Sequence, residues 1–530
     1  MREIKVLKES LFLVCLFLVC LLIQGCGLDD VVDEPTVTPK PTATQKPIST
    51  LNPTLCNGKG TITYSNSIYV GECKDGRREG KGVLTFNSGG KYDGEWENGI
   101  KEGQGTYYYG NSTYIGEWKD GKREGKGVFT FNSGEKYDGE WYNDMKNGQG
   151  TIFYEDNSTY IGKWKDGNKD GQGVMTYLWG DKYDGEWYND KKDGKGKKIN
   201  QEGICEGIWN NGVLTEITNQ DSYEEAYVYF NKIRKQAGLI ELEVNGILEE
   251  SAKNHSNYVV LHSDDWKDQG YINDKGITGH NEEEGKEGYT GFSPADRAIV
   301  QGYLTYYGVS EGMTSRCTAK VSINNLMTAI YHRFGILSLG ANEIGIGLSK
   351  KDNMLIEFIH DTGNANLNNL CRYNSYSTGT FYSNICVNKE YIISVTDYNS
   401  AFNDVMKLNP KYVLWPSQDS VNNLYKFTGE SPDPMPDYDE TGNPISIQFN
   451  KYYYPNKITM KSFKLFKKDR EIIKIDILME KTDPNKFFSA YEYALFPLEV
   501  LEKNTTYKAE FKYRYNGMNK NIIWSFKTMK

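Results

Sequence analysis

The stretch that decides the fold is YIGEWKDGKREGKG, residues 114–127, and close variants of it recur along the first half of the chain. The typical copy carries a tyrosine, a glycine and a tryptophan at alternate positions, followed by a turn signal such as Asp120-Gly121 and a Gly-x-Gly. The copies begin at Tyr69, Tyr92, Tyr114, Tyr137, Tyr160, Tyr183 and Cys205, with a period of 22 or 23 residues. A fixed period of this length is typical of a repeat protein.

Each copy is predicted to be a β-hairpin. In a strand, residues at i, i+2 and i+4 lie on one face, so Tyr114, Gly116 and Trp118 would share a face and the glycine would leave room for a neighbouring ring. The Asp-Gly turn reverses the chain into a second strand. One hairpin is unstable alone, but stacked hairpins bury a continuous aromatic seam. The region 56–215 is therefore predicted to be an all-β hairpin solenoid.

This pattern resembles MORN repeats from Asn57 to about Leu214. Two copies depart from it: Cys73 replaces the tryptophan of the first, and Cys205 replaces the tyrosine of the last. Both are terminal copies, where repeat arrays are commonly atypical.

The N-terminus is predicted to be a secretory signal over residues 1–26. A basic head is followed by the uncharged apolar run Leu11–Ile23 and then by Gly25-Cys26. The end of this segment resembles a bacterial lipobox, which implies that Cys26 carries lipid; the alternative is a plain transmembrane anchor with a chance cysteine. Residues 27–55 are rich in Pro and Thr and predict a semi-rigid linker. We therefore expect an extracytoplasmic protein held on the outer face of the cell membrane.

Composition limits the partners and the covalent framework. The net charge is −9, with basic and acidic residues interleaved, which argues against a nucleic-acid partner. Cys15 and Cys20 leave with the signal. Six cysteines then remain in the predicted mature body: Cys56, Cys73, Cys205, Cys317, Cys371 and Cys386. Local pairs Cys56–Cys73 and Cys371–Cys386 are plausible in an oxidising compartment, and free buried thiols are an equal alternative.

Helical periodicity begins at Ser222. Apolar residues at Ala226, Phe230, Ile233 and Ala237 predict one helix, and a second is expected from about Asn245 to Leu261. Together with Thr290-Gly-Phe-Ser-Pro, Tyr331-His332-Arg333 and Glu343-Ile-Gly-Ile-Gly, these segments resemble a CAP domain, the superfamily of cysteine-rich secretory, antigen 5 and pathogenesis-related 1 proteins. The resemblance covers residues 220–362 and implies an α-β-α sandwich with a cleft.

The same resemblance implies a tetrad of two histidines and two acids in that cleft. His280, Glu311 and His332 match three of its members, but no Asp or Glu lies between Gly312 and Tyr331, where the fourth should be. His280 and His332 could hold a divalent metal such as Zn²⁺, or the cluster could be purely structural.

The other histidines and one acidic run are not expected to belong to a functional site. His255 is expected to be a packed helix residue without an acidic partner, His262 a surface residue, and His360 a weak candidate. The run Glu282-Glu283-Glu284 is interpreted as a solvated loop.

The last third of the chain is predicted to contain no chemistry. Residues 363–415 match no motif, and the segment 363–430 is expected to be an extension and linker that leads into a Pro-rich hinge. From 431 to 530, short alternating stretches such as Ile445–Phe449 and Tyr507–Phe511 predict an antiparallel sandwich that resembles bacterial Ig-like domains.

We therefore favour a multidomain, lipid-anchored binding or scaffold protein over an enzyme, with a protein, lipid or cell-envelope ligand on the repeats. The alternatives are a metal-assisted hydrolase of cell-wall or peptide material and a lipid-binding protein. The sequence does not identify the ligand or the oligomeric state.

Overall fold

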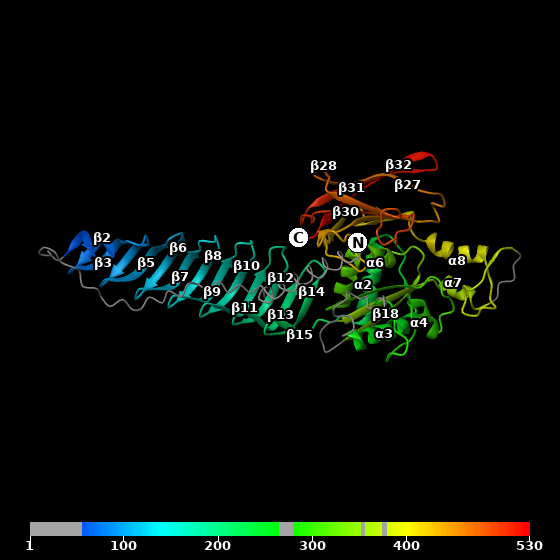
Figure 1. Cartoon of the computed structure of the whole chain (residues 1–530), viewed down its shortest axis with the longest axis horizontal. Helices are drawn as coiled ribbons and strands as arrows, with labels where there is room; N and C mark the ends of the chain where they lie inside the picture. The colour runs from blue at the N-terminus through cyan, green and yellow to red at the C-terminus, as the bar shows by residue number, and fades with distance from the viewer. Residues whose placement is uncertain (1–55, 264–278, 351–355, 374–378) are drawn as a thin grey trace, which may run out of the picture.

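The computed structural model describes residues 56–263, 279–350, 356–373 and 379–530. The predicted signal peptide with Cys26, and the linker up to residue 55, lie outside these residues. Within the described part of the chain, no helix combines the length and the apolar character needed to cross a membrane. Figure 1 shows an elongated repeat sheet at one end and two further units beside each other at the other end.

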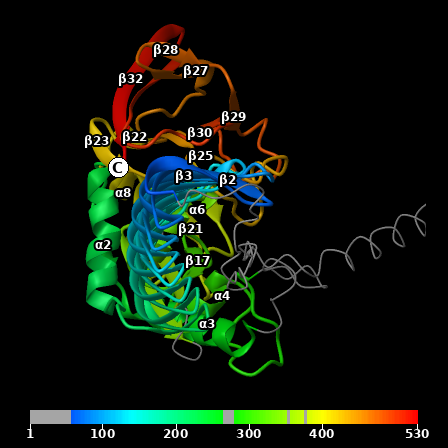
Figure 2. The ribbon, with the colours of Figure 1, turned by 90° about the vertical axis from the view of Figure 1, so that its left-hand side faces the viewer.

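The described repeat region is one antiparallel sheet of 15 strands, in which every strand pairs with its neighbours in sequence. Viewed along its length, the sheet runs as a regular stack of hairpins (Figure 2). The strands are β1 (Gly58–Thr63), β2 (Ser67–Lys74), β3 (Arg77–Phe86), β4 (Lys91–Glu97), β5 (Ile100–Tyr109), β6 (Ser112–Lys119), β7 (Lys122–Thr130), β8 (Lys136–Tyr142), β9 (Met145–Phe153), β10 (Thr159–Lys165), β11 (Asn168–Thr176), β12 (Lys182–Tyr188), β13 (Lys191–Ile199), β14 (Ile204–Asn210) and β15 (Val213–Ile217).

An aromatic seam holds this sheet together, as the alternation predicted. The ring of Trp118 meets Tyr114 of its own repeat and Tyr92 of the preceding one edge to face, each with 5.2 Å between centroids. The polar ends of these rings are satisfied: Tyr114 Oη donates to the Glu117 carbonyl at 3.0 Å, and Trp118 Nε1 to the Gly105 carbonyl at 3.3 Å. Edge-to-face pairs with satisfied N–H and O–H groups are favourable beyond the area they bury.

A row of basic side chains covers the tryptophans. Lys101 Nζ lies 3.8 Å from the Trp118 ring centroid, and the Arg123 guanidinium carbon 4.2 Å from that of Trp141. Such cation–π contacts stabilise by about 0.5–2 kcal/mol each. The aromatic seam is therefore covered by basic side chains, although the sheet is a single layer.

The central unit has helices on both faces of a small sheet of strand order β16-β18-β19-β17. Buried residues of α2, α5 and α6 form one core with Ile344, Ile346 and Phe358, and α3 packs on the opposite face around Ile359. The elements are α2 (Tyr223–Gln236), β16 (Glu243–Val244), α3 (Gly246–Leu261), α4 (Pro294–Val300), β17 (Ser310–Arg316), α5 (Ala319–Thr328), α6 (Ile330–Ile336), β18 (Glu343–Lys350) and β19 (Ile356–Gly363).

Gly345 and Gly347 allow α3 to lie directly on β18. A Cβ atom at Gly347 would come within 2.1 Å of the Ala252 carbonyl oxygen, so no larger residue fits there. This close contact fixes the position of α3, and with it the histidine that α3 carries.

The segment after the central unit is an extension with its own small core. It contains α7 (Ala365–Leu370), β20 (Phe381–Tyr382), β21 (Ile393–Ser394) and α8 (Val395–Met406). The disulfide Cys371–Cys386 lies in this core, between Leu367 and Ile393.

The C-terminal unit consists of two sheets that share one core, in which Phe449, Phe511 and Trp524 are buried. The strand orders are β22-β26-β30-β29 and β23-β32-β31-β27-β28, with a separate pair β24-β25. The strands are β22 (Tyr412–Trp415), β23 (Ser420–Asn423), β24 (Lys426–Phe427), β25 (Thr441–Gly442), β26 (Ile445–Phe449), β27 (Thr459–Lys467), β28 (Arg470–Ile472), β29 (Ile475–Met479), β30 (Glu492–Pro497), β31 (Thr506–Tyr515) and β32 (Met518–Thr528).

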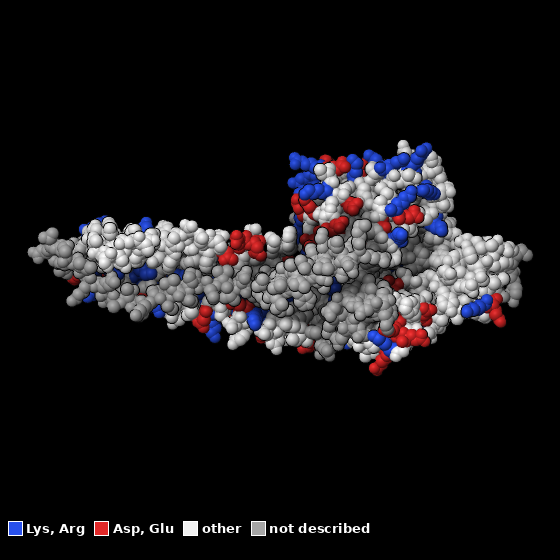
Figure 3. All heavy atoms as spheres, viewed as in Figure 1, with Lys and Arg blue, Asp and Glu red and all other residues white. Residues whose placement is uncertain are grey.

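Two features of this unit differ from the expectation. Its sheets include β22 and β23, which lie before the expected boundary at residue 431. In addition, β23 pairs with β32 in parallel, whereas the alternation predicted an antiparallel arrangement. The strands β22 and β23 have only 4 residues each, so the sequence carries little signal for them. Figure 3 shows lysine and arginine side chains over the outer surface of the unit, and several pair with acids, as Lys464 does with Glu471.

The repeat sheet joins the other two units through the turn between β13 and β14. Glu202 in this turn accepts a hydrogen bond from Asn325 Nδ2 of the central unit at 3.0 Å, and its carbonyl accepts one from Asn324 Nδ2 at 2.7 Å. Gln201 Nε2 donates to the Lys426 carbonyl of the C-terminal unit at 2.9 Å. Both Gln201 and Glu202 are buried.

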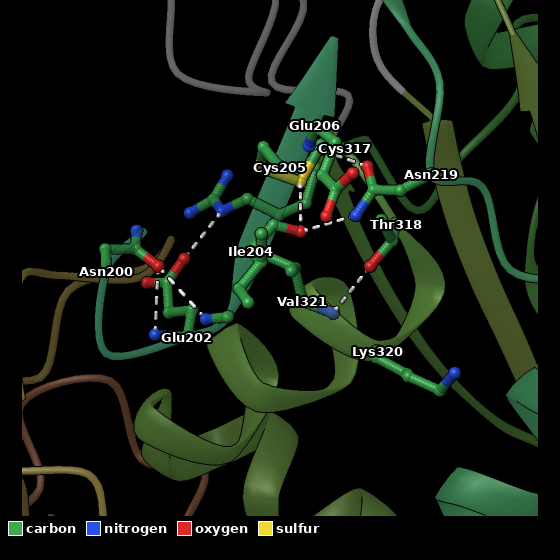
Figure 4. Close-up of a disulfide and its surroundings, with 12 residues drawn as sticks. Asn200, Glu202, Ile204, Cys205, Glu206, Asn219, Cys317, Thr318, Lys320 and Val321 are labelled. Atoms are coloured by element: carbon green, nitrogen blue, oxygen red, sulfur yellow. Dashed lines mark hydrogen bonds and ion pairs between the residues drawn. A yellow bond between two sulfur atoms is a disulfide. The ribbon is translucent and has the colours of Figure 1, made fainter. Parts of the chain in front are cut away.

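A disulfide reinforces this junction. Cys205 on β14 is bonded to Cys317, next to α5 (Figure 4). The sequence left the pairing of these two cysteines open. The local pairs Cys56–Cys73 and Cys371–Cys386, for which free thiols were the alternative, are both formed.

Candidate functional site: a buried histidine and carboxylate cluster

His280, Glu311 and His332, the three residues singled out from the sequence, lie together. Glu311 is at the start of β17 and its side chain is 1% exposed, while that of His280 is 32% exposed. His280 Nδ1 lies 2.8 Å from Glu311 Oε1. The rings of His280 and His332 are stacked, with 5.8 Å between their centroids. The cluster therefore combines two imidazoles with a buried carboxylate.

Arg297 makes Glu311 a stable anion. Arg297, fully buried on α4, donates through Nη2 to Glu311 Oε2, and through Nη1 to the His280 carbonyl at 3.0 Å. Burial acts to raise the pKa of Glu311, but Arg297, and then His255 and His280, outweigh it and hold the pKa below its usual value. A charged partner that stabilises the ionised form is the physical cause.

His332 has an acidic partner that the sequence did not reveal. His332 Nδ1 lies 3.1 Å from Glu430 Oε1, and the Glu430 side chain is 2% exposed. Glu430 belongs to the Pro-rich segment that was expected to be only a hinge. The family order of motifs predicts the second acid between Gly312 and Tyr331; a carboxylate beside His332 is instead supplied from about 100 residues further along the chain. Its pairing depends on tertiary structure, so no local pattern indicated it.

His255 and Glu282 correct two interpretations. His255 is buried on α3, as expected, but it has an acidic partner: its Nδ1 lies 3.0 Å from Glu282 Oε1. Its Nε2 lies 3.0 Å from the Gly279 carbonyl oxygen. Glu282 is not on a solvated loop; it is fully buried and accepts hydrogen bonds from Thr290 N at 2.5 Å and Gly291 N at 3.2 Å. Because Glu282 stands in a run of three acids, the sequence did not distinguish it from its solvated neighbours. Its closeness to His280 in the sequence was the available signal that it belongs to the cluster.

His360 and Asp361 lie beside the cluster on opposite faces of β19. Both ring nitrogens of His360 lack a hydrogen-bond partner among the described residues, and burial, followed by the nearby His332, lowers the pKa of His360 to about 3. Asp361 faces Glu311 across the β17–β19 pair. Burial, and then Glu311, raise the pKa of Asp361 well above its usual value. His262, expected on the surface, is partly exposed and lies 2.9 Å through Nε2 from the Glu287 carbonyl oxygen.

The two residues expected as metal ligands, His280 and His332, are each paired with a carboxylate. Among the described residues, no group of three or more His, Cys, Asp or Glu side chains is placed to hold an ion. The Nδ1 atoms of His280 and His332 each face a carboxylate within hydrogen-bonding distance. The arrangement is instead two imidazole–carboxylate pairs, which can exchange protons or hydrogen bonds with a bound molecule.

Comparison with protein families agrees with the repeat pattern and with the order of motifs around the cluster. The family model for the MORN repeat matches residues 69–91, 92–113, 114–136, 137–159, 160–182 and 183–203. The model for the cysteine-rich secretory protein family, CAP, matches residues 227–355. The chain contains MORN repeats and a CAP domain. The CAP match includes His280, Glu311 and His332 and ends well before Glu430, so the carboxylate at His332 comes from outside the matched domain.

Solved structures show more distant similarity. An outer surface protein from Borrelia burgdorferi is 19% identical, with 26% of this chain and 87% of that chain covered and a TM-score of 0.20. A cysteine-rich secretory protein from Staphylococcus aureus is 14% identical, with 49% of this chain and 83% of that chain covered and a TM-score of 0.20. No curated protein sequence matches the chain.

Proposed function

We propose that the protein is an extracytoplasmic binding scaffold, anchored to the outer face of the cell membrane by lipid on Cys26. The MORN repeats form an arm and the CAP domain carries the histidine cluster. The observation that carries this proposal is the buried junction at Gln201 and Glu202, reinforced by Cys205–Cys317, because it joins the repeat sheet firmly to the other two units. A fixed arm is suited to holding a bound partner at a set distance from the CAP domain. We interpret the C-terminal unit as an Ig-like domain.

The outer face of the repeat sheet supports a binding role. Val70, Ile115 and Ile161 occupy equivalent positions in alternate repeats and are 55%, 56% and 57% exposed. The intervening repeats carry Asp at this position. An open hollow on the same sheet is lined in part by Tyr142 and Lys163. Exposed apolar residues that stand singly need no special explanation, so the support lies in their repetition at equivalent positions of alternate repeats.

The binding proposal is tested with the triple variant Val70→Asp, Ile115→Asp and Ile161→Asp. Because neighbouring repeats carry Asp at the same position, we expect the fold to be retained and binding to isolated cell-envelope material to fall at least about tenfold, a loss of about 1.4 kcal/mol. The charge-matched control replaces three exposed turn residues, Asn87→Asp, Asn111→Asp and Asn132→Asp. Unchanged binding by the first variant, or equal loss in the control, would contradict a role for this face.

The anchor is tested separately. Cys26→Ala should release the protein from the membrane fraction and remove the mass of the lipid, whereas Cys20→Ala, a change within the predicted signal, should leave both unchanged. Membrane-bound Cys26→Ala protein of unchanged lipid mass would show that the anchor is elsewhere.

A further inference from the structure

Glu430 makes an unusual double contact with the CAP domain. Its Oε1 atom lies 3.1 Å from Tyr331 N and 3.1 Å from His332 Nδ1. Helix α6 has Ala329 at its N-cap and no side-chain hydrogen bond there. Glu430 therefore satisfies an N–H group in the first turn of α6 that the local sequence leaves unpaired, and the same oxygen binds the imidazole.

The residues on either side of His332 also bind the C-terminal unit. Tyr331 Oη donates to Asp483 and accepts from Asn485 Nδ2 at 3.0 Å. Arg333 is fully buried and donates to the Pro444 carbonyl at 2.6 Å and to Asn443 Oδ1 at 2.8 Å. All three residues of the Tyr331-His332-Arg333 motif thus contact the segment from Glu430 onward. This unit is part of the surroundings of the cluster rather than a detached spacer.

We propose that Glu430 is a positioning residue for His332, so that the histidine cluster of the CAP domain is completed by the C-terminal unit. An ionised carboxylate only accepts hydrogen bonds, so the ring nitrogen facing it carries the proton. In the neutral ring, Nδ1 is then protonated and Nε2 is an acceptor. Glu311 imposes the same state on His280. A molecule that binds both rings must therefore present hydrogen-bond donors, as hydroxyl and ammonium groups do.

This inference deepens the proposed function, and it rests on that function for the role of the cluster as a binding site. Its test observes the imidazole itself and does not use envelope binding. The positioning role can therefore fail while binding by the repeats survives, and the reverse also holds.

The experiment is nitrogen-15 NMR of the full chain labelled on histidine, at pH 8, where the tautomer of each ring is read from its two nitrogen resonances. The chain has five histidines, which can be assigned by substitution. We compare the wild type with Glu430→Met, which removes the acceptor at similar length, and Glu430→Gln, whose single amide oxygen can accept from both donors. Glu440→Met is the matched control, because Glu440 lies in the same segment but pairs with Lys426.

We expect His332 to be protonated on Nδ1 in the wild type, in Glu430→Gln and in Glu440→Met, and to move toward the Nε2-protonated form in Glu430→Met. An Nε2-protonated His332 in the wild type would overturn the proposal without any variant. An unchanged His332 tautomer in folded Glu430→Met would overturn it as well. If Glu430→Met does not fold, the wild-type and Glu430→Gln spectra decide.

Discussion

At the scale of single residues, two neighbouring carboxyl groups have pKa values shifted in opposite directions. Glu311 and Asp361 are cross-strand partners: the side chain of Glu311 is 1% exposed, and Asp361 is fully buried. Arg297 stabilises the Glu311 anion and so lowers the pKa of Glu311. Burial and the Glu311 charge raise the pKa of Asp361. Environments that move two pKa values apart can assign a proton donor and an acceptor to adjacent groups. The buried pair thus combines a carboxyl group that holds its proton more tightly, Asp361, with one that loses its proton more readily, Glu311.

His360 should make stability depend on pH. Burial lowers its pKa from 6.5 to about 3, so the folded state binds a proton less readily than the unfolded state. The resulting stability is complete above pH 6.5 and is lost as the pH falls toward 3. The unfolding free energy of the wild type should fall between pH 6.5 and pH 4. In His360→Leu we expect this fall to be smaller by roughly 3 kcal/mol.

The measurement is urea unfolding of the full chain at several pH values. Phe358→Leu serves as a control, because it alters the same buried region without removing a titrating group, and it should keep the wild-type pH dependence. A His360→Leu protein with the wild-type acid sensitivity would show that other groups cause it.

The sequence identified the part of the cluster that lies in family motifs, namely His280, Glu311 and His332. It missed Glu282, because one buried acid within a run of three has no distinguishing local pattern. It also missed Glu430, because that residue reaches His332 only through the packing of the C-terminal unit. Residues that act through long-range contacts leave no periodic signal in a single sequence.

At the scale of elements, glycine sets how closely the repeat strands approach. A Cβ at Gly116 would lie 2.5 Å from Gly127 Cα and 2.6 Å from Tyr114 Oη. The backbone of β7 cannot withdraw without losing its pairing on both sides. The aromatic seam and the Gly-x-Gly motif are therefore two parts of one packing arrangement.

We expect Gly116→Val to lower the unfolding free energy of the full chain by about 1–3 kcal/mol, because the added atoms force the strands apart. The measurement is tryptophan fluorescence during urea unfolding. Gly90→Val is the matched control: a Cβ there has its nearest contact at 3.5 Å, from Phe86, and should cost much less. Equal losses in both variants would contradict the packing argument.

Elements with a strong period were predicted well and short ones were not. The helix predicted from Ser222 is α2, and the second, predicted from about Asn245 to Leu261, is α3 at Gly246–Leu261. By contrast, sequence alternation does not show where the short stretch around Ile472 and Ile475 changes sheet. The stretch is divided between β28 and β29, which lie in different sheets. Three to five residues carry too little alternation to reveal a change of sheet.

At the scale of the whole molecule, the junction turn decides whether the repeat sheet is a rigid arm. Glu202 binds the central unit and Gln201 the C-terminal unit, so two adjacent side chains connect all three units. Tyr425 Oη donates a further hydrogen bond, at 3.2 Å, to the carbonyl of Trp179, which lies in the turn between β11 and β12. The sheet is thereby held at two of its turns and by one disulfide, Cys205–Cys317.

Removing these contacts should turn the rigid arm into a hinged one. In the variant Gln201→Ala, Glu202→Ala, Cys205→Ser and Cys317→Ser, the side-chain hydrogen bonds of residues 201 and 202 and the covalent link of the junction are lost, while the aromatic seam is untouched. We expect small-angle X-ray scattering of the full chain to show a broader distribution of interatomic distances than in the wild type. The control Cys371→Ser and Cys386→Ser removes a disulfide in the extension, away from the junction, and should leave the distribution unchanged. Scattering of the junction variant identical to that of the wild type would mean that other contacts fix the arm, and the scaffold proposal would lose its main structural support.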